Sequence, residues 1–346
     1  MRNKVTISDI ARQSGVSVST VSLVLNNKPG VSQETRARVL QVAEELGYPI
    51  TPTAAAARSR RLATVGMVVK TDPDIPPQAN PFYSKVMVGI EDVCRRNGMN
   101  LLFATLPVDE YNRPLEIPQM LANEIVDGLL MLGFFVDEDC AARLSAYDVP
   151  IVLVDGYSDS DCYDSVVSDN FRAAYQAVEH LLSRGHRRIG LVGGEGGSFS
   201  FPSLRDRRNG YLRALKENGI SEIYTADFNI NQSHGFEETL ALLREHPQIT
   251  ALFCVNDDAA SDAIRAAQEL GRRVPEDLSV IGYDDTYIAS HTHPRLSSMH
   301  VDTTAMGRSA VHLLSLRADN PESARMTLTI HPTLVERESV GPVPAG

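Results

Sequence analysis

Apolar positions recur every three to four residues through the first fifty positions of the chain. In the stretch SDIARQSGVSVSTVSLVLN, residues 8–26, this spacing predicts two short helices on either side of Gly15. A third helix is predicted over residues 33–46, QETRARVLQVAEEL. Isolated helices below about 12–15 residues are marginal in water, so the three helices must bury their apolar stripes against one another. Two short helices joined by a tight turn and followed by a third are typical of a helix-turn-helix.

Hydroxyl side chains stand where these helices are expected to begin. Thr6, Ser17 and Ser32 each precede a helical stretch and can cap it by accepting a bond from a backbone N–H. In a helix-turn-helix, the second helix enters the major groove of DNA, where hydroxyl and amide groups suit phosphates and base edges and apolar groups suit thymine methyls. The candidate DNA contacts of this head are Thr6, Ser17, Val18, Ser19, Thr20, Ser22, Leu23 and Asn26. A small helical bundle that binds a protein is the alternative interpretation.

From residue 64 onward, short apolar runs alternate with amphipathic helical stretches. The runs are TVGMVVK, MNLLFAT, VDGLLML, VPIVLVD, RIGLVGG, TALFCVND, LSVIGYDD and LSSMHV. One helical stretch, residues 170–185, places Phe171, Val178 and Leu181 on a single face. Buried strands that alternate with helices predict an α/β fold with parallel sheets. Similar runs occur in both halves of this body, so we expect two lobes that face each other across a cleft.

Charge is distributed unevenly between these two parts of the chain. Residues 1–64 hold nine Lys and Arg against four Asp and Glu, which gives +5, whereas the other 282 residues hold 24 against 40, which gives −16. A basic head on an acidic body fits a head that binds a polyanion, although chance in a short window would give the same asymmetry. The 346 residues exceed what one hydrophobic core usually serves, so two or three domains are expected.

The sequence argues against a membrane or secreted protein. No apolar run approaches the roughly 20 residues of a membrane span, and the amino terminus MRNKVTISDIARQSG lacks the apolar core of a secretory signal. The four cysteines, Cys94, Cys140, Cys162 and Cys254, have no CxxC or metal-ligand spacing. We therefore expect a reduced, cytoplasmic setting, and neither a metal site nor another cofactor.

Enzymatic motifs are also missing from the sequence. The glycine-rich stretch VGGEGGSFS follows a predicted strand but lacks Gly-Lys-Ser/Thr and G-x-G-x-x-G, so a plain loop is expected there. His186 is expected at the strand end opposite the cleft, in a structural role. No Gly-x-Ser-x-Gly and no metal-spaced His cluster occurs. No catalytic residue is assigned, and an enzyme is not expected.

Residues 5–48, VTISDIARQSGVSVSTVSLVLNNKPGVSQETRARVLQVAEELGY, resemble the DNA-binding head of the lactose/galactose repressor (LacI/GalR) family without a gap. The body resembles the family's effector-binding core, which has the shape of periplasmic sugar-binding proteins. Three stretches carry this second resemblance, ANPFYSKVMVGIEDVCRRNG, SVVSDNFRAAYQAVEHLLSRGHRRIGLVGG and VPEDLSVIGYDD, of which the last two are the most specific. The resemblance implies that Val18, Ser19 and Leu23 select the operator sequence.

The segment PITPTAAAARSRRLATVG, residues 49–66, joins the head to the body. It can be a basic linker or a helix that forms only with a partner, because its alanines favour a helix while its length does not. It resembles the family's hinge helix, which folds in the minor groove and wedges a leucine into a base step. Ala57 stands at the leucine position and is followed by the matching Arg58. Both are DNA-contact candidates, but a methyl group is a poor wedge, so a weaker kink is expected.

These patterns predict three segments: a DNA-binding head over 1–48, a hinge over 49–63 and an effector-binding core over 64–340. The resemblance implies that the chain crosses between the lobes near residues 164, 292 and 325. On that basis the first lobe would comprise about 64–164 and 293–325. The second lobe would comprise about 165–292 and 326–340.

Polar side chains follow the predicted strands of the body, and parallel sheets bind ligands beyond the carboxyl ends of their strands. This rule selects Asp155, Asn256, Asp257, Asp284 and Asp285, together with Arg205, Arg207 and Phe228. Carboxylates and guanidinium groups bind hydroxyls, and an aromatic ring covers the apolar side of a sugar or base. For any single Asp or Asn, a helix cap or a strand-end turn is the alternative. By the resemblance, the effector contacts are Phe82, Asp155, Arg207, Phe228, Asn256 and Asp284.

We therefore predict a transcription repressor whose affinity for a pseudo-palindromic operator in double-stranded DNA is controlled by a small polar effector, a sugar or sugar derivative. A homodimer is expected, and a tetramer is left open. The alternative is a soluble sugar-binding or sugar-processing protein whose head docks to another protein. Salt dependence separates the two, because DNA binding weakens steeply with salt as counterions are released.

Overall fold

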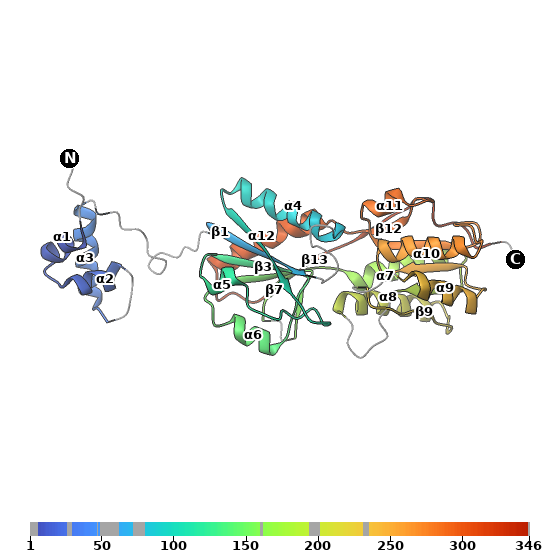
Figure 1. Ribbon diagram of the computed structural model, residues 1–346, viewed down its shortest axis with the longest axis horizontal. Coiled ribbons are helices and arrows are strands. Elements are labelled where there is room, and N and C mark those ends of the chain that lie inside the picture. The colour runs from blue at the N-terminus through green and yellow to red at the C-terminus, as the bar shows by residue number, and fades with distance from the viewer. Residues whose placement is uncertain are drawn as a thin grey trace. The chain divides into compact units, whose positions relative to one another are not determined.

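The computed structural model describes residues 6–25, 30–46, 48, 62–71, 80–159, 162–193, 201–230 and 235–344. The chain forms two compact units, Met1–Arg61 and Leu62–Gly346, coloured dark blue and light blue to red in Figure 1. The boundary between them falls within the expected hinge, which lies outside the described residues up to position 61. Among the described helices, none combines the length and apolarity needed to cross a bilayer.

The first unit holds three short helices around a small apolar core. They are α1 (Ile7–Ser14), α2 (Val18–Leu25) and α3 (Gln33–Glu45). Gly15 ends α1 in the left-handed region, at φ 70°, which turns the chain toward α2. The buried residues are Ile10, Ala11, Val21, Val24, Val39 and Ala43, with one pair from each helix. The three-helix head that the apolar spacing predicts is present.

The second unit contains two α/β lobes. The first lobe has a six-stranded parallel sheet in the order β13-β7-β5-β3-β1-β2. Its strands are β1 (Thr64–Thr71), β2 (Asn100–Pro107), β3 (Gly128–Leu132), β5 (Ile151–Val154), β7 (Asp164–Ser168) and β13 (Thr327–Ile330). A separate parallel pair is formed by β4 (Phe135–Val136) and β6 (Tyr157–Ser158). The helices of this lobe are α4 (Pro81–Arg96), α5 (Gln119–Ala122), α6 (Glu138–Leu144) and α12 (Thr303–Asp319).

Neighbouring residues of each strand in the first lobe point to opposite faces of the sheet. On β1, Met67 and Val69 pack into the cluster that includes α4 and α12, whereas Val68 packs into the cluster that includes α5 and α6. The central strands β1, β3 and β5 are buried on both faces, which explains their continuous apolar runs in the sequence.

The second lobe has its own six-stranded sheet in the order β14-β12-β11-β10-β8-β9, parallel except for β14. Its strands are β8 (Ile189–Val192), β9 (Tyr224–Ala226), β10 (Ala251–Cys254), β11 (Ser279–Asp284), β12 (Ser297–His300) and β14 (Thr333–Val335). The helices are α7 (Asn170–Ser183), α8 (Pro202–Glu217), α9 (Phe236–Glu245), α10 (Asp257–Glu269) and α11 (Tyr287–His291). In Figure 1 the two lobes lie side by side, and α7 and α8 occupy the part of the second lobe nearer the first.

The chain crosses between the lobes three times, somewhat later than the sequence implied. Strands β7 and β13 belong to the first sheet and β12 to the second, so the crossings follow residues 168, 300 and 330. The positions expected near 164, 292 and 325 are therefore too early by four to eight residues. The resemblance implied only approximate positions, and the sheet to which each strand belongs depends on pairing partners far away in sequence.

The face expected for residues 170–185 is correct except at its first member. Val178 and Leu181 are buried, but Phe171 is 42% exposed. Helices α7 and α8 approach so closely at this point that a Cβ added to Gly210 would lie 2.3 Å from the Phe171 carbonyl oxygen. No room is left between the backbones for a phenyl ring, so the side chain lies outside the contact.

Candidate functional site

The outer side of α2 presents a mixed surface of hydroxyls and apolar groups. Val18 is 43% exposed and Ser19 is also exposed, whereas Leu23 is partly buried. The Ser17 hydroxyl lies 2.7 Å from that of Ser19 and 2.8 Å from that of Thr20, and it caps α2 by accepting from the Thr20 N–H at 3.0 Å. A chain of hydroxyls therefore lines the first turn of the helix, which is the part that reads DNA in a helix-turn-helix.

Of the remaining DNA-contact candidates, Thr6 and Ser22 are among the described residues and three others are not. Ser22 is partly buried on α2, and Thr6 caps α1. The Thr6 backbone N–H and hydroxyl both donate to the Asp9 carboxylate, at 3.0 and 2.7 Å. Asn26, Ala57 and Arg58 lie outside the described residues.

In the second unit, Arg207 is the centre of a buried polar cluster between the lobes. It lies on α8 and is 6% exposed. Its Nε donates to Asn170 Oδ1 at 2.9 Å, and its two terminal nitrogens donate to the Val255 carbonyl and to Asp284 Oδ1, the latter at 3.4 Å. The guanidinium carbon lies 3.6 Å from the centre of the Tyr283 ring, where a cation is attracted by the ring. Arg207 therefore joins the ends of β10 and β11 to the start of α7.

Asp155 approaches this cluster from the first lobe, directly after β5. It is buried, and it has a positive φ of 47°. Its Oδ2 accepts from the Tyr83 hydroxyl at 3.1 Å, but its buried Oδ1 has no hydrogen-bond partner within the described part of the chain. Burial raises the pKa of Asp155, and the charge of Arg207 opposes this shift. An unsatisfied buried acceptor at a strand end is a place where a ligand donor group would bind favourably.

Asp284 provides the second carboxylate of the cluster, at the end of β11. Burial raises its pKa to about 6, Arg207 lowers it and the negative charge of Asp155 raises it. Two buried carboxylates and one guanidinium leave an excess of acceptors, so the arrangement suits a ligand that donates several hydrogen bonds. Hydroxyl groups of a polyol have this property.

Of the four other candidates, Phe82 and Asn256 lie near the cluster, and Arg205 points away from it. Phe82 is partly buried and packs edge-on against Tyr83 at 5.4 Å between ring centres, and Asn256 follows Val255 while its Oδ1 caps α10 through the Ala259 N–H at 2.8 Å. Arg205 is exposed, because two residues along a helix correspond to roughly 200° of rotation away from Arg207. Phe228 is buried in the apolar cluster that includes α9 and α10.

Residues that the sequence reasoning did not single out complete the cluster. Tyr83 holds Asp155, and Asn170 donates to the Tyr157 hydroxyl at 3.2 Å across the two lobes. Tyr157 also packs edge-on against Phe201 of the second lobe at 5.5 Å. The strand-end rule would have found Asn170, which begins the helix after β7, but Tyr83 and Tyr157 enter from elements that no strand-end rule covers.

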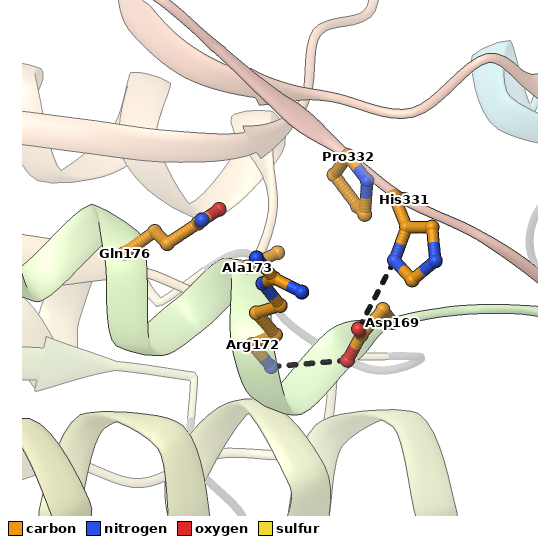
Figure 2. A pocket seen from close by; sticks show the side chains of 6 residues that line it. All are labelled: Asp169, Arg172, Ala173, Gln176, His331 and Pro332. Atoms are coloured by element: carbon orange, nitrogen blue, oxygen red, sulfur yellow. Dashed lines mark hydrogen bonds and ion pairs between the residues drawn. The ribbon is translucent and has the colours of Figure 1, made fainter.

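A separate pocket of about 270 Å³ lies where the first and third crossings meet (Figure 2). Asp169 Oδ2 lies 3.2 Å from His331 Nδ1, and Asp169 Oδ1 caps α7 through the Arg172 N–H at 3.2 Å. None of the effector candidates lines this pocket, whose lining residues are Asp169, Arg172, Ala173, Gln176, His331 and Pro332.

His186 lies apart from these features, as expected of a structural residue. It is fully buried, and its ring nitrogens lie 3.0 Å from the Thr250 hydroxyl and 3.2 Å from the Gly341 carbonyl oxygen. Among the described residues, no group of His, Cys, Asp and Glu is arranged to hold a metal ion.

Comparison with known proteins agrees with both parts of this architecture. Residues 6–49 match the bacterial regulatory proteins of the lacI family, and residues 178–340 match the periplasmic binding protein-like domain. The HTH-type transcriptional repressor PurR of Aliivibrio salmonicida is 32% identical over 97% of this chain and 98% of its own length. The chain belongs to the LacI family. It is thus a DNA-binding transcription repressor with an effector domain, not an enzyme.

Two further LacI-family proteins resemble it along almost their whole length. The ribose operon repressor of Haemophilus influenzae is 33% identical over 97% of this chain and 98% of its own. The solved structure of a lac repressor dimer bound to operator and the anti-inducer ONPF superposes with a TM-score of 0.65, at 26% identity, covering 98% of this chain and 100% of that one. These similarities show a LacI-like fold of a helix-turn-helix head and two parallel α/β lobes.

Proposed function

We propose that this protein is a dimeric repressor that binds a pseudo-palindromic operator through α2 and releases or retains it according to a sugar bound between the lobes. One observation supports effector binding at this place. Asp155 from the first lobe and Arg207 and Asp284 from the second meet in one buried cluster, in which Asp155 Oδ1 has no hydrogen-bond partner among the described residues. A ligand that touches both lobes changes the balance between open and closed arrangements by its differential affinity for them.

The sugar assignment rests on chemistry and on one relative. Carboxylate acceptors beside aromatic rings fit a polyhydroxylated ring with an apolar face, and a ribose operon repressor is among the similar proteins. D-ribose is therefore the first probe, and cellobiose is a larger sugar for comparison.

The proposal that the protein binds an operator rests on the surface of α2. Exposed Val18 and Ser19 and the neighbouring hydroxyls give a surface that contacts both methyl groups and phosphates. A two-fold dimer places two such helices on the half-sites of a palindrome. Val88 on α4 and Phe103 on the edge strand β2, 60% and 40% exposed, are apolar residues of the first lobe that a second copy would cover.

The experiment that tests this function is a pair of titrations. Operators selected from random DNA are bound to the protein and followed by fluorescence anisotropy, first with salt and then with D-ribose or cellobiose. We expect a steep loss of affinity with salt and a shift in operator affinity with one of the sugars. Folded Arg207→Ala and Asp284→Ala proteins should bind operator but respond at least tenfold more weakly to the sugar, because each loses a charged hydrogen bond.

Two outcomes would contradict the proposal. Selection of asymmetric or random sites would refute the dimeric readout. Wild-type sugar response in both variants, or no response of the wild type to either sugar, would refute the effector site or its sugar assignment. Circular dichroism of both variants at the assay temperature verifies that they are folded.

A further inference from the structure

The effector candidate Asp284 begins a turn that its own residues do not favour. Asp284 and Asp285 follow each other with φ values of 94° and 53°, in the left-handed region that residues with a Cβ rarely adopt. Two consecutive residues of this kind persist only where surrounding contacts hold them. The contacts that hold this turn therefore also determine where the Asp284 carboxylate lies.

Asp257, the first residue of α10, accepts hydrogen bonds that hold the turn in place. Its Oδ2 accepts from the backbone N–H of Thr286 at 2.6 Å and from the Thr286 hydroxyl at 3.0 Å. Its Oδ1 accepts from the Ser298 hydroxyl at 2.6 Å. Both oxygens are thus used, and both residues that Asp257 binds lie beyond Asp284 in the chain.

Ser298 on β12 connects Asp257 to Asp285 by hydrogen bonds. Because the Ser298 hydroxyl donates its one hydrogen to Asp257, its oxygen is left to accept, and it accepts from the Asp285 N–H at 3.2 Å. The two N–H groups that follow Asp284 are therefore satisfied by Asp257, one directly and one through Ser298. Loss of the Asp257 carboxylate would remove the acceptor of the Thr286 N–H and would free the Ser298 hydroxyl to rotate away from the Asp285 N–H.

The Asp285 carboxylate also holds the turn, through contacts with two basic side chains. Asp285 pairs with Arg337 at 2.7 Å and with His300 Nδ1 at 3.0 Å. Asp284 is left as the acidic side chain of the turn that is directed to Arg207.

Burial makes Asp257 an unusual choice for a purely structural position. It is 1% exposed, its partners are uncharged, and Gly282 leaves the space for it, since a Cβ there would lie 2.6 Å from its Oδ1. Burial raises the pKa of Asp257, as does Asp284, whereas the Ser298 and Thr286 hydrogen bonds lower it. A buried carboxyl without a cationic partner is costly, so its function is to place the groups that donate to it.

We infer that Asp257 is a positioning residue of the effector site, which holds the Asp284–Asp285 turn through Thr286 and Ser298 and so places the Asp284 carboxylate against Arg207. This inference rests on the proposed function, because Asp284 is an effector contact only there.

Hydrogen exchange of the full chain, measured by mass spectrometry, tests the inference without a ligand. Asp257→Ala should speed exchange of the Asp285 and Thr286 amides at least tenfold while leaving the β10 amides unchanged. Asp257→Asn retains an oxygen for Thr286 and should restore part of the protection. Asp262→Ala removes a partly buried carboxylate of the same helix that pairs with the exposed Arg265, so it is the matched control and should exchange as wild type.

Binding of D-ribose, measured by calorimetry, supplies the second readout. We expect Asp257→Ala to weaken binding about tenfold, Asp257→Asn to weaken it less, and Asp262→Ala to leave it unchanged. Unchanged exchange at Asp285 and Thr286 in Asp257→Ala would overturn the inference, as would an equal rise at β10, which indicates general destabilisation. Wild-type D-ribose affinity in Asp284→Ala contradicts the proposed function instead, whatever the exchange of the turn.

Discussion

The Asn170 amide donates to the Tyr157 hydroxyl at 3.2 Å, and this bond joins the two lobes beside Arg207. Asn170 starts α7 directly after the first crossing, and its Oδ1 accepts from Arg207. A single amide thus connects a first-lobe tyrosine to the guanidinium that organises the second-lobe part of the site. Its energetic contribution can be measured because each group has a conservative replacement.

Tyr157→Phe should lower the free energy of unfolding of the second unit by about 0.5–1.5 kcal/mol, the net value of a neutral hydrogen bond. The ring and its edge-on contact with Phe201 remain. Urea unfolding followed by circular dichroism measures the change. The matched control is Tyr175→Phe, which removes an exposed bond to Glu217 and should cost less. A free energy of unfolding of Tyr157→Phe equal to that of the wild type would mean that the bond between the lobes adds no stability.

Gly133→Ala should weaken D-ribose binding tenfold or more. Gly133 has φ 79°, and a Cβ there would lie 2.2 Å from the Tyr83 hydroxyl, so the ring that holds Asp155 must move. Gly98→Ala is a close control, since Gly98 has φ 65° and open space around it. Both variants lose roughly 1 kcal/mol of stability from the unfavourable φ, but calorimetry should show weakened binding in Gly133→Ala alone. Equal affinities would place the sugar away from Tyr83.

The stability of the protein should depend on pH through Asp284. Its pKa rises from an ordinary 3.8 to about 6 on folding, so the folded state binds the proton more tightly between these values. The free energy of unfolding then decreases as pH rises from about 4 to 6, by up to about 3 kcal/mol for this group. Asp284→Asn removes the group, so its unfolding free energy should decrease less over the same window. Parallel pH profiles from urea unfolding would contradict this assignment.

Substitutions on α2 should change which operator is chosen. Val18→Asn, Ser19→Ala and Leu23→Ala alter groups on the expected reading surface, and a base contact contributes about 1–3 kcal/mol of discrimination. Selection from a random DNA library should return different half-sites for these variants. Gln41→Ala changes an exposed residue of α3 that bonds to Glu45, and it should select the wild-type half-site. Identical half-sites from all four proteins would exclude α2 as the reading helix.

Local pattern was sufficient to predict the head and the sheets, but not the full site. The stripes that contain Ile10, Val21 and Val39 form the core of the head because helical spacing alone decides which side is buried. Asp155, Arg207 and Asp284 could be selected because the ends of parallel strands share one edge of a sheet. Tyr83 and Tyr157 could not be selected, since they reach the site from a helix and from a two-residue strand pair of the other lobe.

Arg205 and the crossings show two further limits of sequence reasoning. Arg205 and Arg207 both lie in the first two turns of α8, yet helix rotation places one in solvent and the other in the cluster. The first and third crossings were placed too early because β7 and β13 pair with each other although their partner residues, such as Ser165 and Thr327, lie 162 positions apart in the chain. Such pairing is a property of the folded sheet, and no local window contains it.

The three crossings also determine how this protein can be recombined. Each lobe is assembled from segments that are not contiguous in the chain, since α12 and β13 return to the first lobe after β8–β12 of the second, and β14 then returns to the second. A chimera made with one junction near residue 169 would combine the first five main-sheet strands of one parent with the α12 and β13 of another. Exchange of an intact lobe between two relatives therefore needs junctions at all three crossings, and gene fusions that cut the second unit once between its lobes will divide a hydrophobic core.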